Sequence, residues 1–414
     1  MLWRDRCTPP GPRRPTRKSD VLQFPTNALS SHLESLLKEV HGAPGQALRM
    51  PVKLELGGGL GAAVQAVQTV AMWSRLAQGF CPVVLSPSFA AQEATRERFA
   101  STLPGMAALY FSSSVTSGNE SLDRYRALEA VAPRVKAMQD SDFRNTLRGI
   151  GVALVCFAGA KSEFLNPLYS RPAAGSVRGH ADFRVLLPRV LAQLGAGLAE
   201  MLTEGQLELL SALVYQLFLN TDEHAAVDVH GRRYATGLRG FTARLTTIDD
   251  VSSLVRYSGE DTALRTYLTK LALLPGQRAE PVKDKKLPTG PVRLVELSVF
   301  DTGPGLALRW LSQTEGLLSY RDFTEERELD AVQSCFGKHA TTKASQYSGL
   351  GLPMALMAMK RLNAFMTLRT GRMSLYQDFS VGETEAFNPK RRYPAKQRLS
   401  EIAGTGYTVW FKVP

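Results

Sequence analysis

Short apolar runs alternate with longer amphipathic stretches through residues 21–160 of the chain. Short runs rich in β-branched residues predict buried strands, and apolar residues that recur with the helical period predict helices. The strands expected on this basis are 52–56, 82–85, 107–111 and 152–157, and the helices are 27–40, 62–76, 90–101 and 121–138. Strands that alternate with helices in this way predict an α/β domain with a layered sheet over residues 21–160.

The pattern changes in the second half of the chain. An irregular stretch at 161–185 is expected to form a linker, and a longer series of helices and strands follows it. In order, these are helices 183–202 and 204–224, strands 230–233 and 241–247, a helical insertion at 249–273, a strand at 295–301, a hairpin of 366–369 with 373–376, and a terminal strand at 407–413. The predicted fold is therefore α+β, with a smaller α/β domain before a mixed sheet covered by helices in the domain 186–414.

Composition places the chain among ordinary globular proteins. Its 414 residues are 44% hydrophobic and 21% charged, which is sufficient for two or three domains. The longest apolar run, 149–160, is too short to cross a bilayer, and the N-terminus has no apolar secretory segment. Four cysteines lie far apart without metal-ligand spacing, as is usual for reduced thiols. We therefore expect a cytoplasmic protein that does not contact a membrane.

The net charge of +12 is concentrated in two segments. Residues 1–18 and residues 388–398 each carry a net charge of +5, so most of the excess lies outside the predicted folded bulk. The first belongs to a basic, proline-rich tail at 1–20 that is expected to be disordered, and the second to a basic loop at 377–400. Both segments suit nucleic acid or an acidic protein, and both are equally consistent with solvated surface, so charge alone does not decide.

One predicted strand ends in a carboxylate that two glycines follow. The sequence V-E-L-S-V-F-D-T-G-P-G places Asp301 at the strand end and Gly303 and Gly305 after it. Such a strand delivers one carboxylate into a loop whose backbone can approach a ligand closely. Acidic and glycine-rich turns also close many strands without any function, so this motif needs support from the rest of the chain.

Polar residues line one face of the helix expected at 204–224. Gln216, Asn220 and His224 are spaced four residues apart, which places them along one side of the helix. Most of the surrounding positions are Leu, Val and Phe, so the rest of this helix is expected to be buried. A buried amide needs a hydrogen-bond partner or a ligand, whereas an exposed polar stripe needs neither.

A third stretch combines basic, hydroxyl and glycine residues before a helix that ends near residue 362. It contains Lys338, His339 and Lys343 and ends in Gly349-Leu350-Gly351. Backbone N–H groups at a helix start, with lysines nearby, suit a phosphate group, although many such glycines only cap a helix. Closer to the C-terminus, Gly404-Thr405 precedes the last strand.

In this order the motifs resemble those of the Bergerat-fold ATPases, which include gyrase, the ninety-kilodalton heat-shock chaperones, mismatch-repair ATPases and sensor histidine kinases. That family has an N-box helix with an essential Asn, a D-x-G-x-G strand end, a lid, a G-x-G helix start, a hairpin, and a G-T before the last strand. The matching segments here are Asn220, 301–305, the lid 306–348, 348–352 and Gly404-Thr405. The resemblance covers about half the chain and implies a histidine-kinase-like ATPase domain, a Bergerat-type sandwich, over 186–414.

The N-terminal domain carries a weaker motif. A glycine cluster, Gly57 to Gly61, follows the first predicted strand but lacks the GK[ST] of a P-loop. It fits a dinucleotide-binding turn only loosely, because no acidic residue ends the next strand, so a tight turn is favoured. The helix that follows, with Trp73 and Arg75 near its end, is similar to that of STAS-type regulatory modules.

The resemblance implies a role for each motif in binding Mg²⁺ and ATP. Asp301 would accept a hydrogen bond from the adenine amine, with Thr405 completing the contact through water. Asn220 would be a ligand of Mg²⁺ through its carbonyl oxygen. The backbone would approach the base at Gly303 and Gly305 and hold phosphate at Gly349, Leu350 and Gly351. In the lid, Lys338, His339 or Lys343 would contact the γ-phosphate.

One position departs from the hydrolysing members of that family. Many of them have a Glu four residues before the Asn, where it activates water, and this chain has Gln216 there. An amide can orient a water molecule but cannot take its proton. Glu223 and Asp222 are the nearest substitutes, although both side chains are expected to project elsewhere on the helix. The resemblance therefore predicts ATP binding and slow hydrolysis by a nucleotide-driven switch in signalling or defence.

Three other functions stay open at this level. A protein kinase of the histidine-kinase type would act on a separate partner, because no phosphoacceptor helix is found before residue 200. A nucleic-acid-associated ATPase would use 1–18 and 388–398, although a transducer domain of the gyrase kind is not expected from this sequence. A non-catalytic nucleotide-sensing scaffold is consistent with Gln216. A protein partner is expected in each case, and a homodimer is compatible with all of them.

Overall fold

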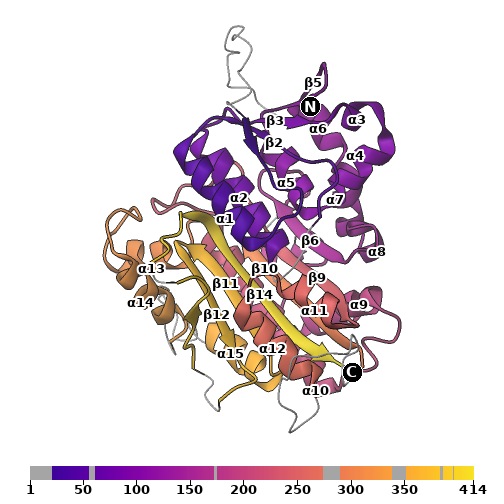
Figure 1. Ribbon diagram of the computed structural model, residues 1–414, viewed down its shortest axis with the longest axis vertical. Helices are drawn as coiled ribbons and strands as arrows, with labels where there is room; N and C mark the ends of the chain where they lie inside the picture. The colour runs from indigo at the N-terminus through magenta and orange to yellow at the C-terminus, as the bar shows by residue number, and fades with distance from the viewer. Residues whose placement is uncertain are drawn as a thin grey trace.

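The computed structural model describes residues 21–55, 61–171, 175–273, 290–337, 351–382, 386–394 and 396–414, and these residues form a mixed α+β fold. Its framework consists of two large sheets, with helices packed against both (Figure 1). The predicted α+β class is confirmed at this level. Within the described ranges, no helix has the length and apolar character needed to cross a membrane.

The N-terminal sheet contains five short strands in sequential order. They are β1 (Val21–Gln23), β2 (Ala47–Arg49), β3 (Pro82–Leu85), β4 (Ser114–Ser117) and β5 (Glu120–Asp123). The first four are parallel and β5 pairs antiparallel with β4. Parallel neighbours need crossover connections, and these contain α1 (Ser30–Gly42), α2 (Ala62–Leu76), α3 (Pro87–Ala91), α4 (Glu93–Ala100) and α5 (Leu103–Phe111). Three further helices follow β5, namely α6 (Arg124–Glu129), α7 (Ala132–Gln139) and α8 (Phe143–Thr146).

Several of the predicted secondary-structure elements of the N-terminal half are not found in the structure. The expected strand 107–111 lies inside α5, whose first turn is capped by Thr102, which accepts a hydrogen bond from the N–H of Gly105 at 3.1 Å. All nine residues of α5 are buried, so the helix has no polar face from which its period could be recognised. The expected helix 121–138 divides into β5, α6 and α7. The described part of the expected strand 52–56 forms a single bridge at Glu55 and lies after the observed β2.

The larger sheet has the strand order β13-β12-β11-β14-β10-β9-β6, and all neighbouring strands are antiparallel. The strands are β6 (Val152–Phe157), β9 (Leu238–Ile248), β10 (Val292–Asp301), β11 (Phe365–Gly371), β12 (Met373–Asp378), β13 (Lys390–Arg391) and β14 (Ile402–Val413). The predicted strands 295–301 and 407–413 lie in β10 and β14, and the predicted hairpin is β11 with β12. β6 differs from expectation, because it pairs with β9 and forms an edge of this sheet. The expected strand 230–233 is reduced to a bridge between Val227 and Arg233.

Helix α10 (Glu204–Ala225) packs against this larger sheet. It begins with a capping box in which Thr203 and Gln206 each accept a hydrogen bond from the other's backbone N–H. Its neighbours are α9 (His180–Leu194), α15 (Gly351–Arg361), β9 and β10. Further helices of this half are α11 (Val251–Ser258), α12 (Thr262–Ala272), α13 (Leu306–Thr314) and α14 (Glu325–Cys335).

The segments predicted as a linker and as a lid both contain secondary structure and buried residues. In the segment 161–185, Leu165 and Leu168 are fully buried, and β7 (Tyr169–Arg171) pairs with β8 (Ser176–Val177). The described part of the expected lid, 306–337, contains α13 and α14. Between these helices, the hydroxyl of Tyr320 donates a hydrogen bond to the carbonyl of Pro304 at 3.0 Å.

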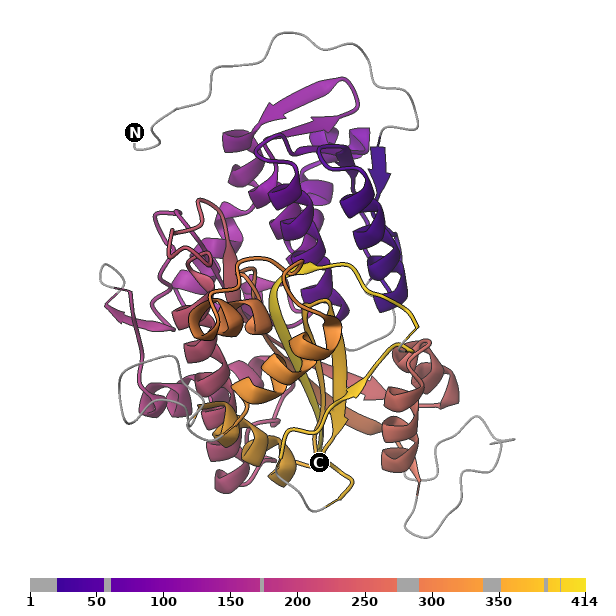
Figure 2. The ribbon, with the colours of Figure 1, turned by 90° about the vertical axis from the view of Figure 1, so that its left-hand side faces the viewer.

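Helix α2 lies between the two sheets. It packs against α1 and α5 of the N-terminal half and against β14 and β10 of the larger sheet (Figures 1 and 2). Eleven of its fifteen residues are buried, which is the pattern of a helix enclosed on all sides. One cluster of buried apolar residues accordingly runs from the N-terminal sheet through α2 into the larger sheet. The two halves of the chain therefore share a hydrophobic core.

Candidate functional site

Asp301 ends β10 as a buried carboxyl group held by backbone N–H groups. The residue is 5% exposed, and Oδ1 accepts hydrogen bonds from the N–H of Gly303 at 2.8 Å and of Thr405 at 3.2 Å. Burial has the largest effect on this group and raises the pKa of Asp301 to about 7, although both hydrogen bonds favour the ionised form. Among the described residues no donor binds Oδ2, so this oxygen is available to a further donor.

Polar contacts join the ends of three strands around this carboxyl group. Thr405 of β14 is buried, and its hydroxyl lies 3.2 Å from the hydroxyl of Thr370 on β11. The Thr370 hydroxyl also accepts a hydrogen bond from the N–H of Leu306 at 3.0 Å. The predicted residues Asp301 and Thr405 are therefore brought together, and the first turn of α13 is connected to them.

The glycines of the D-x-G-x-G segment make close contacts with the protein itself. A Cβ on Gly303 would lie 2.7 Å from Cα of Ala225, near the end of α10. Gly305 has a φ of +88°, and a Cβ there would lie 2.6 Å from the hydroxyl of Tyr320. The backbone at Gly303 and Gly305, predicted to approach a ligand closely, instead lies close to α10 and to Tyr320.

Gln216 lies at the contact between α10 and α15. Its Nε2 is 3.9 Å from Sδ of Met354, and a Cβ on Gly351 would lie 2.8 Å from its Oε1. Asn220 follows one helical turn later on the same face and is half-buried. No described residue forms a hydrogen bond with the Asn220 side chain, so its amide is available for a ligand.

The two acids after Asn220 occupy different faces of α10. Asp222 accepts hydrogen bonds from the hydroxyl of Tyr169 and, at 2.8 Å, from Nε of Arg239. Arg239 is 5% exposed and also pairs with Glu163 at 3.0 Å, so Asp222 belongs to a buried ion-pair network. Glu223 is exposed and lies seven residues after Gln216, which returns it to the Gln216 face. The expectation that both acids project elsewhere therefore holds for Asp222 and is wrong for Glu223.

Several predicted phosphate contacts lie outside the described residues. These are Lys338, His339, Lys343, Gly349 and Leu350. The described chain resumes at Gly351, which is the first residue of α15 and adjoins Gln216. Of the residues predicted to contact phosphate, only Gly351 belongs to the described part of the chain.

One aromatic residue near Asp301, Tyr407, has no signal in the sequence. Tyr407 of β14 is fully buried, and its hydroxyl has no hydrogen-bond partner among the described residues. The ring of Phe336, at the end of α14, meets the Tyr407 ring edge-on with 6.4 Å between centroids. Burial raises the pKa of Tyr407 well above its ordinary value, so the hydroxyl stays protonated and can donate. In the sequence, Tyr407 cannot be distinguished from any other inward-facing residue of a buried strand.

A pocket of about 260 Å³ lies close to the end of α10. Its lining includes Glu163, Ala225, Tyr234, Arg239 and Thr302. Asp301, Asn220 and Thr405 do not line it, so this pocket is separate from the predicted ligand contacts and adjoins them through Thr302.

Metal binding by a cluster of acidic or sulfur ligands has no support in the described ranges. Within them, no three His, Cys, Asp or Glu side chains are grouped so that they could hold an ion. A metal bound here would depend on a donor of another kind, such as the amide oxygen of Asn220, and on ligands from a bound molecule.

Comparisons of the chain with protein-family models, with curated proteins and with solved structures found no match. The Bergerat-type arrangement stays a prediction from the motifs, and the site is defined by the residues and distances given above.

Proposed function

We propose that the C-terminal half of this protein binds Mg-ATP and hydrolyses it slowly, as a nucleotide-driven switch. The observation that carries the proposal is the carboxyl group of Asp301. It is buried at a strand end and fixed through Oδ1 by two backbone N–H groups, and its Oδ2 has no hydrogen-bond partner among the described residues. One oriented acceptor of this kind suits the exocyclic amine of adenine.

The same acceptor predicts a preference for adenine over guanine. Guanine has a carbonyl oxygen where adenine has its amine, so guanine would face an ionised Asp301 with a second acceptor. Leaving two buried acceptors without a donor costs more than the hydrogen bond gained with adenine. The protonated hydroxyl of Tyr407, close enough to Asp301 to feel its charge, is an additional donor on this side of the sheet.

Asn220 supports the metal part of the proposal. Mg²⁺ prefers oxygen ligands and commonly binds to few protein groups beside phosphate and water. The half-buried Asn220 amide has no partner among the described residues and lies one turn from Gln216, which adjoins the start of α15. Its carbonyl oxygen would bind Mg²⁺, and the N–H groups at the start of α15 would face the phosphates.

Slow hydrolysis follows from the side chains around Asn220. By the resemblance, Gln216 would occupy the position of a general base, and an amide cannot take a proton from water. Asp222 accepts hydrogen bonds from Tyr169 and Arg239, so we assign it a structural role and not that of the base. Glu223 lies on the Gln216 face but is exposed, and we propose it as the weak base of the reaction.

A non-catalytic nucleotide sensor is the second candidate, because Gln216 favours it equally. The nucleic-acid alternative loses support at the basic loop. Arg391 pairs with Glu325 at 3.1 Å, and Arg392 pairs with Asp261 at 2.7 Å. These two arginines are therefore engaged within the fold and contribute less to a free basic surface.

Thermal unfolding with added nucleotide tests the proposal. Mg-ATP should raise the melting temperature of the wild type and of Asp249→Asn, an exposed control, but not that of Asp301→Asn. Mg-GTP should have a smaller effect on the wild type. An unchanged wild-type melting temperature with Mg-ATP, or equal shifts in both variants, would count against the site. Free phosphate, labelled protein or neither product then separates the ATPase, the kinase and the sensor.

A further inference from the structure

The two sides of β14 have different neighbours. Successive side chains of a strand point to opposite faces, so Gly406 and Thr408 share one face and Thr405 and Tyr407 share the other. A Cβ on Gly406 would lie 2.7 Å from Cγ1 of Val64 in α2. Helix α2 of the N-terminal half therefore lies directly behind the strand that carries Thr405.

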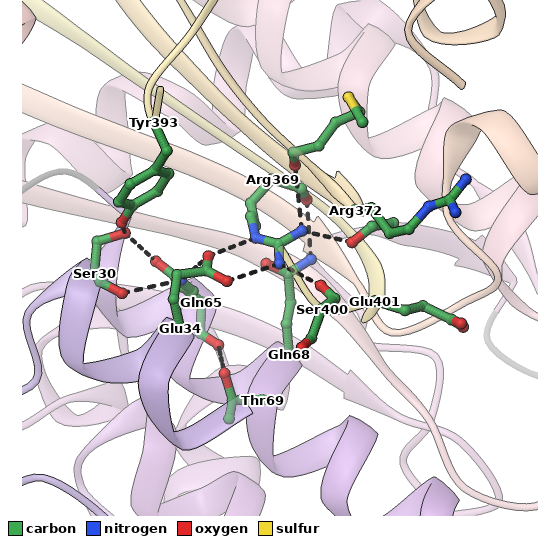
Figure 3. A network of polar contacts seen from close by, with 12 residues as sticks. Ser30, Glu34, Gln65, Gln68, Thr69, Arg369, Arg372, Tyr393, Ser400 and Glu401 are labelled. Carbon is green, nitrogen blue, oxygen red and sulfur yellow. Dashed lines mark hydrogen bonds and ion pairs between the residues drawn. The ribbon is translucent and has the colours of Figure 1, made fainter. Parts of the chain in front are cut away.

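A polar residue of α2 binds the backbone beside the G-T motif. Gln68 is fully buried, and its Nε2 donates hydrogen bonds to the carbonyls of Arg369 and Ala403, each at 3.1 Å. Ala403 immediately precedes Gly404-Thr405. Figure 3 shows Gln68 close to Arg369, at the junction between α2 and the larger sheet.

A buried ion pair holds α1 in place on that sheet (Figure 3). Arg369 of β11 donates to both carboxylate oxygens of Glu34 on α1, at 2.8 and 3.0 Å. Its remaining N–H groups bind the carbonyls of Gly371, Met373 and Ser400. All donors of this guanidinium are used, which leaves one favourable position for α1 against β11.

Arg75, near the end of α2, binds the loop that follows Asp301. Its Nη1 donates to the carbonyl of Gly303 at 3.1 Å, and its Nη2 donates to the carbonyl of Thr302. The guanidinium lies over the ring of Tyr234, 4.7 Å from the ring centroid, and this stacking restricts its plane. Two consecutive carbonyls of the loop are thus held by one planar, permanently charged group from the other half of the chain.

We propose that Arg75 is a positioning residue of the nucleotide site, through which the N-terminal half fixes the Asp301 loop and sets its affinity for ATP. The nucleotide part of this inference rests on the function proposed above. Arg75 acts through the loop backbone and makes no contact with ATP in this scheme. Its positive charge also lowers the pKa of Asp301, which favours the ionised acceptor.

Three variants of the full-length protein test the inference. Arg75→Ala removes the contact, Arg75→Lys keeps the charge without the planar fork, and Arg49→Ala removes an exposed arginine of the same half as a control. Two quantities are measured for each. The first is backbone hydrogen exchange at 301–305 without nucleotide, and the second is the Mg-ATP dissociation constant as a function of pH.

We expect Arg75→Ala to exchange faster at 301–305 and to bind Mg-ATP about tenfold more weakly, as loss of a charged hydrogen-bond donor implies. The pH midpoint of its binding should also move upward, because the ionised form of Asp301 loses a stabilising charge. Arg75→Lys should restore that midpoint while its loop still exchanges faster than in the wild type. Arg49→Ala should match the wild type in both measurements.

Unchanged exchange at 301–305 in Arg75→Ala overturns the inference, whether or not ATP binds. Faster exchange with an unchanged Mg-ATP affinity also overturns it, because the loop contact then has no bearing on the ligand. A wild type that binds no Mg-ATP is a distinct result, which overturns the proposed function and the nucleotide part of the inference together. If Arg75→Ala does not fold, Arg75→Lys compared with Arg49→Lys is judged by the same criteria.

Discussion

At Asp301, burial and hydrogen bonding act in opposite directions on one carboxyl group. The N–H groups of Gly303 and Thr405 favour the ionised form, but burial outweighs them and raises the pKa from 3.8 to about 7. The carboxyl group of Asp301 therefore gains or loses its proton near neutral pH. Under the proposed function, Asp301 accepts a hydrogen bond from adenine only in its ionised form.

We predict that Mg-ATP binds more tightly as the pH rises through about 7, where Asp301 ionises. The ionised fraction of such a group grows about tenfold between pH 6 and pH 8, and affinity should follow it. Dissociation constants measured over this range in the wild type and in Asp301→Asn provide the check. The variant corrects for titration of the phosphates, and equal pH slopes in the two proteins would contradict the prediction.

The raised pKa of Asp301 also determines how the stability of the protein without nucleotide changes with pH. Since the folded-state pKa of Asp301 lies above the unfolded value of 3.8, its stabilising contribution is complete below that value and is lost as the pH rises through about 7. Asp301→Asn should remove this part of the pH dependence of the free energy of unfolding. Urea unfolding at several pH values measures it, and a wild-type curve parallel to that of the variant would reject the raised pKa.

In the proposed function, Gln216 limits the rate of ATP hydrolysis. We predict that Gln216→Glu raises the rate of ATP hydrolysis about a hundredfold, the lower range for a positioned general base. Gln313→Glu, an exposed control on α13, should leave the rate unchanged. The measurement is phosphate release at saturating Mg-ATP. A variant that binds Mg-ATP as well as the wild type but hydrolyses it no faster would show that Gln216 is not at the position of a base.

At the scale of elements, segments with their own turn and capping signals could be predicted. The hairpin of β11 and β12 alternates about Gly371, and α10 begins with a capping box. Elements that depend on contacts with distant parts of the chain could not be predicted. Helix α5 is buried on all faces, and β6 joins the larger sheet only through its pairing with β9, which no local pattern encodes.

The candidate site divides in the same way. Asp301, Gly303 and Thr405 belong to short motifs whose turn chemistry can be recognised in the sequence. The contact that Arg75 makes with the loop after Asp301 could not be predicted, because its acceptor on Gly303 is 228 residues away in the chain and is a backbone carbonyl, which every residue has. Tyr407 is an inward residue of a buried strand and has no distinguishing neighbour in the sequence.

Over the whole molecule, a polar junction inside the shared core holds the two halves together. Glu34 and Arg369 are each 6% exposed, and they join α1 to β11. Removal of one partner from a buried ion pair leaves the other charge uncompensated, which costs more than the pair itself contributes. The position of the N-terminal half on the larger sheet is therefore sensitive to this one pair.

We predict that Glu34→Ala lowers the free energy of unfolding by about 3–5 kcal/mol, the range for breaking a buried ion pair. Glu39→Ala, on the exposed side of the same helix, should change it by less than about 0.5 kcal/mol. Urea unfolding of the full-length variants measures both values. Equal effects of the two substitutions would mean that the Glu34–Arg369 contact does not stabilise the junction.

The central claim is that this chain binds Mg-ATP through Asp301. Calorimetric titration of the full-length protein with Mg-ATP, at a pH where Asp301 is ionised, tests it most directly. We predict saturable binding of one ATP per chain to the wild type and to Asp249→Asn, and binding at least about tenfold weaker to Asp301→Asn. No saturable binding to the wild type, or equal affinity in all three proteins, would contradict the claim.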